Sequence, residues 1–379
     1  MQRFLEAIRR PSLNWLLVLF PLAVVFEIAH RWTHAPWATP TWIFIFSAVA
    51  IIPAAGWMGR ATEHLATRWG EGTGGLLNAT FGNAAELIIA CVALIKAARN
   101  LAPVESMHGI VKASLTGAII GNALLVMGAA LLAGGLLHRR QVFNAVATRA
   151  GATLLILAVV ALVVPALVTH ADPRAAEAVA ELSIELSTLL LLAYAGSLVF
   201  SLHTHRHLYV GQPMEAGHEE EIHEAPWPVR VAIAVLTAAT VGVALLAEML
   251  VGSVEEAAKV LGLSDLFVGV IVVAIVGNAA EHSTAIVVAV RNRMDLSLGI
   301  AIGSSIQIAL FVAPLLVLIS HALGVPMDFV FTLPEIIAVG LSVAVLSHIA
   351  GDGESNWLEG SLLLVVYAML GLLFFHLPG

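Results

Sequence analysis

The sequence predicts an all-α polytopic membrane protein with 11 transmembrane helices, arranged as one N-terminal helix and two inverted five-helix repeats. Three observations predict this fold. The 379 residues are 59% hydrophobic and only 12% charged, whereas an ordinary soluble domain has about 25% charged residues. Apolar runs of about 20 residues, each long enough to cross a bilayer, recur along the whole chain. The motif GNAAE occurs twice inside such runs.

The apolar segments are expected to be helices, because a lipid-exposed sheet edge would leave backbone groups without hydrogen bonds. A β-barrel would instead show alternating segments of about ten residues, which the sequence lacks. The expected spans are 13–30, 41–59, 75–96, 113–137, 150–169, 182–202, 231–252, 266–290, 297–320, 330–349 and 357–376.

Lys and Arg residues indicate how the chain is oriented. The loops and chain ends on the same side of the membrane as the N-terminus hold twice as many Lys and Arg residues as those on the opposite side. In membrane proteins the cytoplasmic loops carry this positive excess. We therefore expect the N-terminus inside and the C-terminus outside. The first apolar segment is long enough to remain as an uncleaved span and no targeting segment is evident, so we expect a multi-pass protein of the bacterial inner (plasma) membrane.

The domain organisation follows from the spans and one polar interruption. Residues 203–228 are rich in His, Glu, Gly and Pro, which is typical of a solvated loop. We expect an N-terminal helix outside the repeat in 1–40, a first five-helix repeat in 41–202, a cytoplasmic acidic loop in 203–229 and a second repeat in 230–379. Because five is odd, equivalent helices of the two repeats cross the membrane in opposite senses. Inverted repeats are typical of secondary transporters, whose substrate site lies near the midplane.

Both copies of the motif place a glutamate inside an apolar run, as TFGNAAELIIACVAL from Thr80 and IVGNAAEHSTAIVVA from Ile275. A charge at the bilayer centre costs about 2.5–3.5 kcal/mol on insertion scales, so Glu86 and Glu281 are expected to be protonated, paired or facing a wet cavity. Two converging carboxylates and nearby amide or carbonyl oxygens suit a hard cation such as Ca²⁺. The same carboxylates can instead hold protons, and this mutual exclusion is a basis for exchange.

Further residues near the motifs are candidates for the same cation and proton site. Asn83 and Asn278 either line the site or form interhelical hydrogen bonds, and Gly82 and Gly277 either expose carbonyls along the transport path or allow close packing. His282 breaks the symmetry of the pair and either relays protons or bonds a neighbouring helix. Polar oxygens follow in the next span of the second repeat, from Ser304, Ser305 and Gln307.

Two other groups of carboxylates are less specific. Glu63 and Glu248 sit near span ends and either line the transport path or mark the membrane interface. Glu219, Glu220 and Glu221 belong to the acidic loop, which is either a solvated linker or a weak Ca²⁺-collecting segment. The stretch HEEEIH in this loop is one residue too long for the HExxH zinc signature. The single Cys91 excludes an internal disulfide and a CxxC metal site.

The stretches GEGTGGLLNATFGNAAEL and VGNAAEHSTAIVVAVRNRMDLSLGIAIGSSIQIAL resemble the cation/proton exchanger family, the Ca²⁺/H⁺ antiporters of the calcium/cation antiporter superfamily. The resemblance extends from about residue 62 to the C-terminus. It implies that Glu86 and Glu281 are the paired cation and proton ligands, with His282 beside them. It also implies that Ser304 and Gln307 line the site and that Glu63 and Glu248 are carboxylates of the transport path. One departure is Ala118, where the family often has Ser. Neither motif contains the proline typical of sodium/calcium exchangers, which favours protons as the counter-ion.

The sequence thus predicts a secondary antiporter that exports Ca²⁺ from the cytoplasm in exchange for H⁺ by alternating access. Exchange of Na⁺ for Ca²⁺, exchange of another divalent cation such as Mn²⁺, and a cation channel remain alternatives. We do not expect an enzyme or a cofactor, since Ca²⁺ would be the transported substrate. The expected partners are Ca²⁺, H⁺ and the lipid bilayer, with no nucleic acid, and the sequence is compatible with a homo-oligomer.

Overall fold

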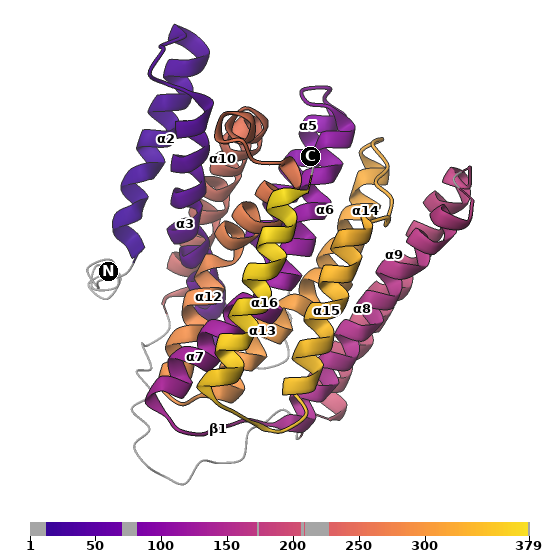
Figure 1. The fold of residues 1–379 in the computed structure, drawn as a ribbon. Coiled ribbons are helices and arrows are strands. Elements are labelled where there is room, and N and C mark those ends of the chain that lie inside the picture. The colour runs from indigo at the N-terminus through magenta and orange to yellow at the C-terminus, as the bar shows by residue number, and fades with distance from the viewer. Residues whose placement is uncertain (1–12, 70–81, 173, 206–207, 209–226, 378–379) are drawn as a thin grey trace.

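The structure is a computed structural model that describes residues 13–69, 82–172, 174–205, 208 and 227–377. Apart from one pair of two-residue strands, the regular elements in these ranges are helices. Figure 1 shows long helices, with α2 and α3 on one side of the molecule and α8 and α9 on the other. The all-helical membrane fold predicted from the sequence is therefore confirmed.

The elements of the first half of the chain are η1 (Leu13–Val18), α2 (Leu19–Ile28), η2 (Ala29–Thr33), α3 (Pro40–Trp69), α5 (Ala84–Ala98), α6 (Val104–Ile120), η3 (Gly121–Val126), α7 (Met127–Leu137), β1 (Gln141–Val142), α8 (Ala145–Ala171), α9 (Ala176–Val199) and η4 (Phe200–Thr204). Those of the second half are α10 (Val229–Leu261), α11 (Asp265–Phe267), η6 (Val268–Val273), α12 (Ala274–Val290), α13 (Met294–Gln307), η7 (Ile308–Val312), α14 (Ala313–Ala322), α15 (Leu333–Ile349), β2 (Glu354–Ser355) and α16 (Trp357–His376).

Within the described ranges, 9 helical segments are long and apolar enough to cross a membrane, and α15 is a shorter apolar helix. With α5, which follows the undescribed residues 70–81, these segments match the predicted spans in order. Several helices are longer than predicted. For example, α10 continues to Leu261 and ends at Gly262, whose φ of 67° is left-handed. Hydropathy marks only the lipid-facing part of a helix, so it misses the polar turns beyond it.

The start of α5 differs from the prediction in a way that matters for the site. The predicted span was 75–96 with Glu86 near its middle, but the described helix begins at Ala84 and Glu86 lies in its first turn. Gly82 and Asn83 form a turn, and Asn83 is the N-cap residue. A hydropathy window does not register such a turn, because the residues on both sides of it are apolar.

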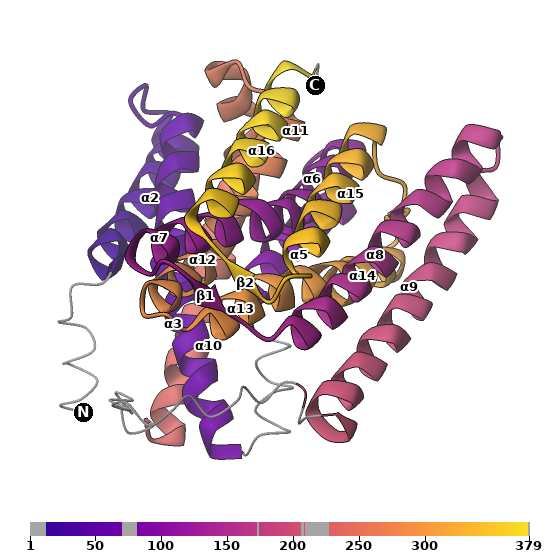
Figure 2. The same ribbon diagram turned by 60° about the horizontal axis from the view of Figure 1, so that its bottom comes forward.

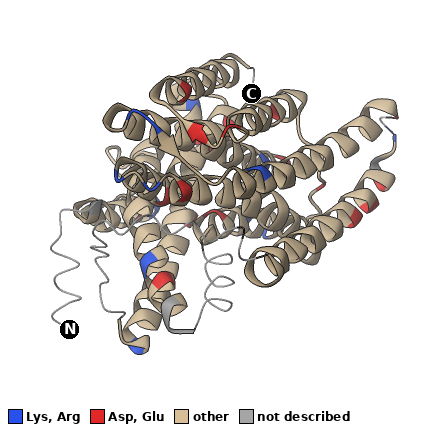
Figure 3. Ribbon diagram, turned by 90° about the horizontal axis from the view of Figure 1, so that it is seen from below, with Lys and Arg blue, Asp and Glu red and all other residues tan. Residues whose placement is uncertain are grey.

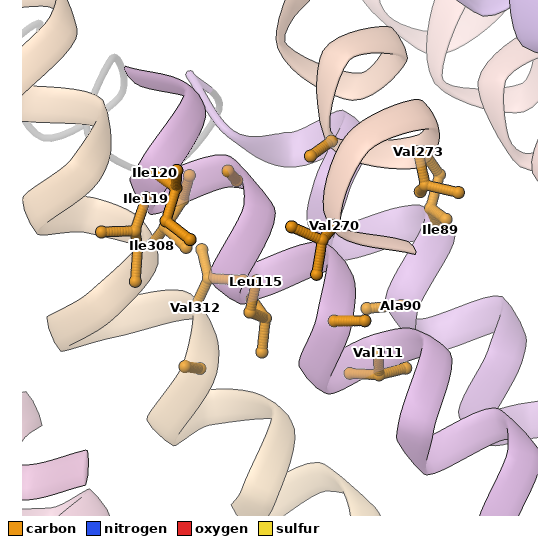
Figure 4. Packing of buried hydrophobic residues seen from close by; sticks show 14 of the residues in the cluster. Ile89, Ala90, Val111, Leu115, Ile119, Ile120, Val270, Val273, Ile308 and Val312 are labelled. Atoms are coloured by element: carbon orange, nitrogen blue, oxygen red, sulfur yellow. The ribbon is translucent and has the colours of Figure 1, made fainter. Parts of the chain in front are cut away.

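Helices from the two halves pack against each other throughout the core. α3 lies along α10, α16 packs on α7, and α9 packs on α14. Figure 4 shows Val111 and Leu115 of α6 facing Val270 of η6, and Leu115 also faces Val312 of η7. The helices are otherwise poor in charge, and Figure 3 shows charged residues as short isolated bands.

A short antiparallel ladder joins two loops on the side opposite the C-terminus. β1 and β2 pair with Gln141 opposite Ser355, and Figure 2 shows the two strands next to each other. Arg140 forms an ion pair with Glu354 across the same ladder. The loop after α7 is thereby attached to the loop before α16, which links the two halves at this face.

Close packing of α6 on η6 depends on Gly117, and this gives a first prediction. A Cβ at this position would lie 2.0 Å from the carbonyl oxygen of Val270. We expect Gly117→Ala to destabilise the fold by about 1–3 kcal/mol through overpacking, measured as a lower thermal-unfolding midpoint in detergent. Gly109→Ala on the same helix is the control, because no atom lies within 4 Å of its added Cβ. Equal midpoints for the two variants would contradict this packing.

Candidate ion-binding site

Glu86 is placed by the beginning of α5. It lies in the first turn of the helix, where the helix dipole stabilises negative charge. Its side chain is half-buried and extends toward α12. A Cβ at Gly277 would lie 3.0 Å from Glu86 Oε1, so the absence of a side chain at Gly277 is what allows this approach. Glu86 of the first motif thus lies directly against Gly277 of the second motif.

Glu281 lies one helical turn after Gly277 on α12. Its side chain is half-buried, and Oε2 is buried with no hydrogen-bond partner among the described residues. The Glu86 carboxylate, which lies against Gly277, is therefore one helical turn along α12 from Glu281. The structure therefore brings together the two glutamates that the sequence singled out. Because like charges repel strongly in an apolar interior, this arrangement needs a cation or protons to neutralise it.

Asn83 links α5 to α13. Its Nδ2 donates to Gln307 Oε1 at 2.5 Å, and its Oδ1 accepts from Ser304 Oγ at 2.7 Å. Both partners were predicted site residues, and they fix the amide of Asn83 in one orientation. Ser305, which was a weaker candidate, instead donates to the carbonyl of Ala301 in its own helix.

The equivalent asparagine of the second motif behaves differently. Asn278 donates to the carbonyl of Ala274 in its own helix at 3.0 Å, and its Oδ1 is buried without a partner among the described residues. His282 is only 9% exposed, and its Nε2 likewise has no partner within the described ranges. Asn122, on η3, adds a buried Nδ2 that lacks one in the same part of the chain. η3 packs against α12, so Asn122 lies on an element in contact with the helix that carries Asn278, Glu281 and His282.

Asn122 is a polar residue that the sequence places beside the candidate positions but that had no assigned role in the predicted site. The available signal was an asparagine inside an apolar span, in the segment SLTGAIIGNALL.

The remaining predicted residues within the described ranges make none of the site contacts described above. The side chains of Glu63 and Glu248 are exposed, on α3 and α10 respectively, unlike the half-buried pair. Gly82 lies in the turn just before Asn83. Glu219, Glu220 and Glu221 fall outside the described residues.

The donor set indicates the kind of cation that this site suits. Among the described residues, no three His, Cys, Asp or Glu side chains gather as a metal cluster. Two carboxylates supplemented by amide, hydroxyl and backbone oxygens are hard ligands, which Ca²⁺ prefers. A structural zinc site would instead use four nitrogen or sulfur ligands.

Fold and site together define a multi-pass helical membrane protein with a carboxylate pair between its two halves. The profile of the sodium/calcium exchanger protein family matches residues 39–203 and 231–376, so the chain belongs to this family.

Curated relatives are similar over nearly their whole length. The Ca(2+)/H(+) antiporter of Synechocystis is 44% identical over 375 residues, covering 96% of each chain. The Ca(2+)/H(+) antiporter ChaA of Bacillus subtilis is 45% identical over 358 residues, covering 94% of this chain and 96% of the relative.

Solved structures share the fold. The structure described as native YfkE superposes with a TM-score of 0.79 at 40% identity, covering 96% of this chain and 99% of that one. The crystal structure of the H⁺/Ca²⁺ exchanger CAX superposes with a TM-score of 0.69, covering 95% of this chain and 91% of that one. Its identity is 13%, so it supports the fold alone.

The contact between Ser304 and Asn83 gives a second prediction. We expect Ser304→Ala to lower the thermal-unfolding midpoint in detergent, because it leaves the buried Oδ1 of Asn83 without its donor, at a cost of about 1–3 kcal/mol. Ser305→Ala is a matched control, since its hydroxyl donates only to its own helix. A larger loss of stability in Ser305→Ala than in Ser304→Ala would contradict the assignment.

Proposed function

We propose that this chain is a secondary antiporter that exports Ca²⁺ from the cytoplasm in exchange for H⁺. The observation that carries the proposal is the approach of Glu86 to Gly277, beside Glu281. Membership of the sodium/calcium exchanger family supports ion exchange in general. Similarity to two bacterial Ca(2+)/H(+) antiporters over nearly the whole chain supports this pair of ions.

Exchange would follow from competition for the same oxygens. Two ionised glutamates neutralise one divalent cation, and two protonated glutamates are neutral without it. Either state removes the repulsion between the carboxylates, whereas the empty ionised state retains it. Protons arriving from the outer side would neutralise Glu86 and Glu281 and release Ca²⁺ there. Loss of those protons toward the cytoplasm would restore the site for the next cation.

Other residues would tune this site. Asn83, held by Ser304 and Gln307, would present an amide oxygen in a fixed position. Asn278 and His282 have buried atoms without partners among the described residues, so they are available to a cation, a proton or water. Glu63, Glu248, Gly82 and Gly277 remain proposed residues of the transport path.

The proposed organisation is α2 outside two inverted repeats, in 41–202 and 230–379. The two ranges matched by the family profile, 39–203 and 231–376, support this division. On this proposal the protein acts as a transporter and not as an enzyme, in a bacterial inner membrane, with its N-terminus in the cytoplasm. The acidic loop would face the cytoplasm.

The family also includes proteins that use sodium, so Na⁺/Ca²⁺ exchange is the second candidate. The motifs argue against it, because neither GNAAE copy has the proline typical of those exchangers. Ion substitution separates these functions from each other and from exchange of another divalent cation such as Mn²⁺.

The direct test of the function is flux in proteoliposomes. We expect an imposed pH gradient to drive ⁴⁵Ca²⁺ uptake in the absence of sodium, because protons leaving the vesicle exchange for Ca²⁺. Uptake that requires sodium and ignores the pH gradient would contradict proton exchange. A current that passes Ca²⁺ with a reversal potential independent of pH would indicate a channel instead.

The same assay tests the glutamates. Glu86→Gln and Glu281→Gln are each expected to reduce coupled uptake to the level of empty liposomes, because one fixed amide can neither bind a proton nor balance the charge of Ca²⁺. Glu177→Gln, an exposed residue of α9, is the control and should retain uptake. Near-normal uptake by either site variant would remove that glutamate from the site.

A further inference from the structure

Lys96 makes an unusual contact between α5 and α10. It lies near the C-terminal end of α5, and its Nζ donates to the backbone carbonyl of Glu248 at 2.8 Å. Glu248 lies in the interior of α10, whose carbonyls normally accept hydrogen bonds from their own helix. A lysine that reaches such a carbonyl therefore fixes the position of one helix against the other.

Gly252 provides the space for this contact. It follows Glu248 by four residues, so both lie on the same face of α10. A Cβ at Gly252 would lie 2.6 Å from Lys96 Nζ. Glycine is unfavourable inside a helix by about 1 kcal/mol relative to alanine. The close approach of the lysine gives a physical reason for its presence here.

The segment η2 also lies next to the contact between Lys96 and Glu248. Arg31, on η2 at the end of the first membrane span, has its Nη2 3.9 Å from Glu248 Oε1 and also pairs with Glu27. The Glu248 side chain is 53% exposed, so this ion pair is weak by itself. The contact of Lys96 with the backbone does not depend on the Glu248 carboxylate.

The contact lies beyond the ion site on the same helix. Glu86 and Lys96 are ten residues apart on α5, a rise of about 15 Å. α5 carries the first site glutamate, whereas α10 carries neither and packs mainly along α3. On the orientation proposed above, Lys96 therefore holds the outer half of α10 against a helix of the site.

We propose that Lys96, Glu248 and Gly252 form an outer latch, which closes the route from the outer side to the ion site when Nζ is bonded to the α10 backbone. On this proposal, opening toward the outside separates this end of α10 from α5, so the bond breaks in each cycle. Lys96 is thus a positioning residue that sets the balance between outward-closed and outward-open states. This inference rests on the proposed alternating-access exchange.

The latch predicts opposite effects at the two faces of the membrane. Lys96→Met keeps the length of the side chain but removes the donor, so the outward-open state becomes more populated. Apparent affinity scales with the fraction of molecules that are competent to bind. We expect the half-saturating Ca²⁺ concentration at the outer face to fall at least about fivefold, while the inner value stays constant or rises. Equal changes at both faces would overturn the latch.

Gly252→Ala tests the same contact from the other helix. The added methyl displaces Nζ, which is the end of a flexible side chain, and alanine favours the helix. We expect the variant to stay folded and, like Lys96→Met, to lower the half-saturating Ca²⁺ concentration at the outer face but not at the inner face. Arg99→Ala, which removes an exposed cation at the same end of α5, is the control. It should not change the half-saturating Ca²⁺ concentration at one face relative to the other.

A measurement independent of transport separates this inference from the proposed function. Val251 is only 4% exposed and adjoins Gly252. In a Cys91→Ala background, Val251→Cys should react slowly with a membrane-impermeant maleimide added outside, and at least about fivefold faster once Lys96→Met is added. Unchanged labelling with intact flux would overturn the latch alone. Faster labelling in a protein without proton-coupled flux would overturn the proposed function and keep the latch.

Discussion

The site depends on one constraint: the Glu86 carboxylate lies against Gly277 of α12, one helical turn from Glu281, so two like charges are held in one apolar region. Glu86 reaches across to α12 because Gly277 has no side chain to exclude it. The interlocking of the two halves, with α9 on α14 and α16 on α7, holds α5 and α12 in the positions that this approach requires. The repulsion is relieved only when a cation or protons occupy the site. A fold in which either a cation or protons must neutralise this pair is suited to ion exchange.

The two halves of the site are related but not equivalent. On one side, Asn83 is satisfied by Ser304 and Gln307, so its geometry is fixed before any ion arrives. On the other side, atoms of Asn278, Glu281 and His282 are buried without partners among the described residues. An ion or a water molecule bound beside the fixed Asn83 amide could interact with the unpartnered atoms of the other half. The asymmetry follows directly from Ser304 and Gln307, which have no polar equivalents at Ala118 and Gly121.

Sequence patterns identified the helices and the glutamate pair, because membrane spans and buried charges leave strong signals in composition. The repeated GNAAE motif indicated that Glu86 and Glu281 are equivalent, and the structure places the Glu86 side chain against Gly277, one helical turn before Glu281. Hydropathy could not place the start of α5, where a turn at Gly82 and Asn83 lies between apolar residues. The contact of Lys96 with Glu248 joins helices far apart in the sequence through a backbone atom, which no residue pattern records.

Competition of cations and protons for the same two carboxylates is the property on which the proposed exchange depends. It is tested most directly by titrating the purified protein with Ca²⁺ in weakly buffered detergent while a pH indicator reports released protons. We expect binding to release protons, Ca²⁺ affinity to fall as the pH is lowered, and Glu281→Gln to release fewer protons than the unsubstituted protein. Ca²⁺ binding with no proton release and with the same affinity across the pH series would contradict it.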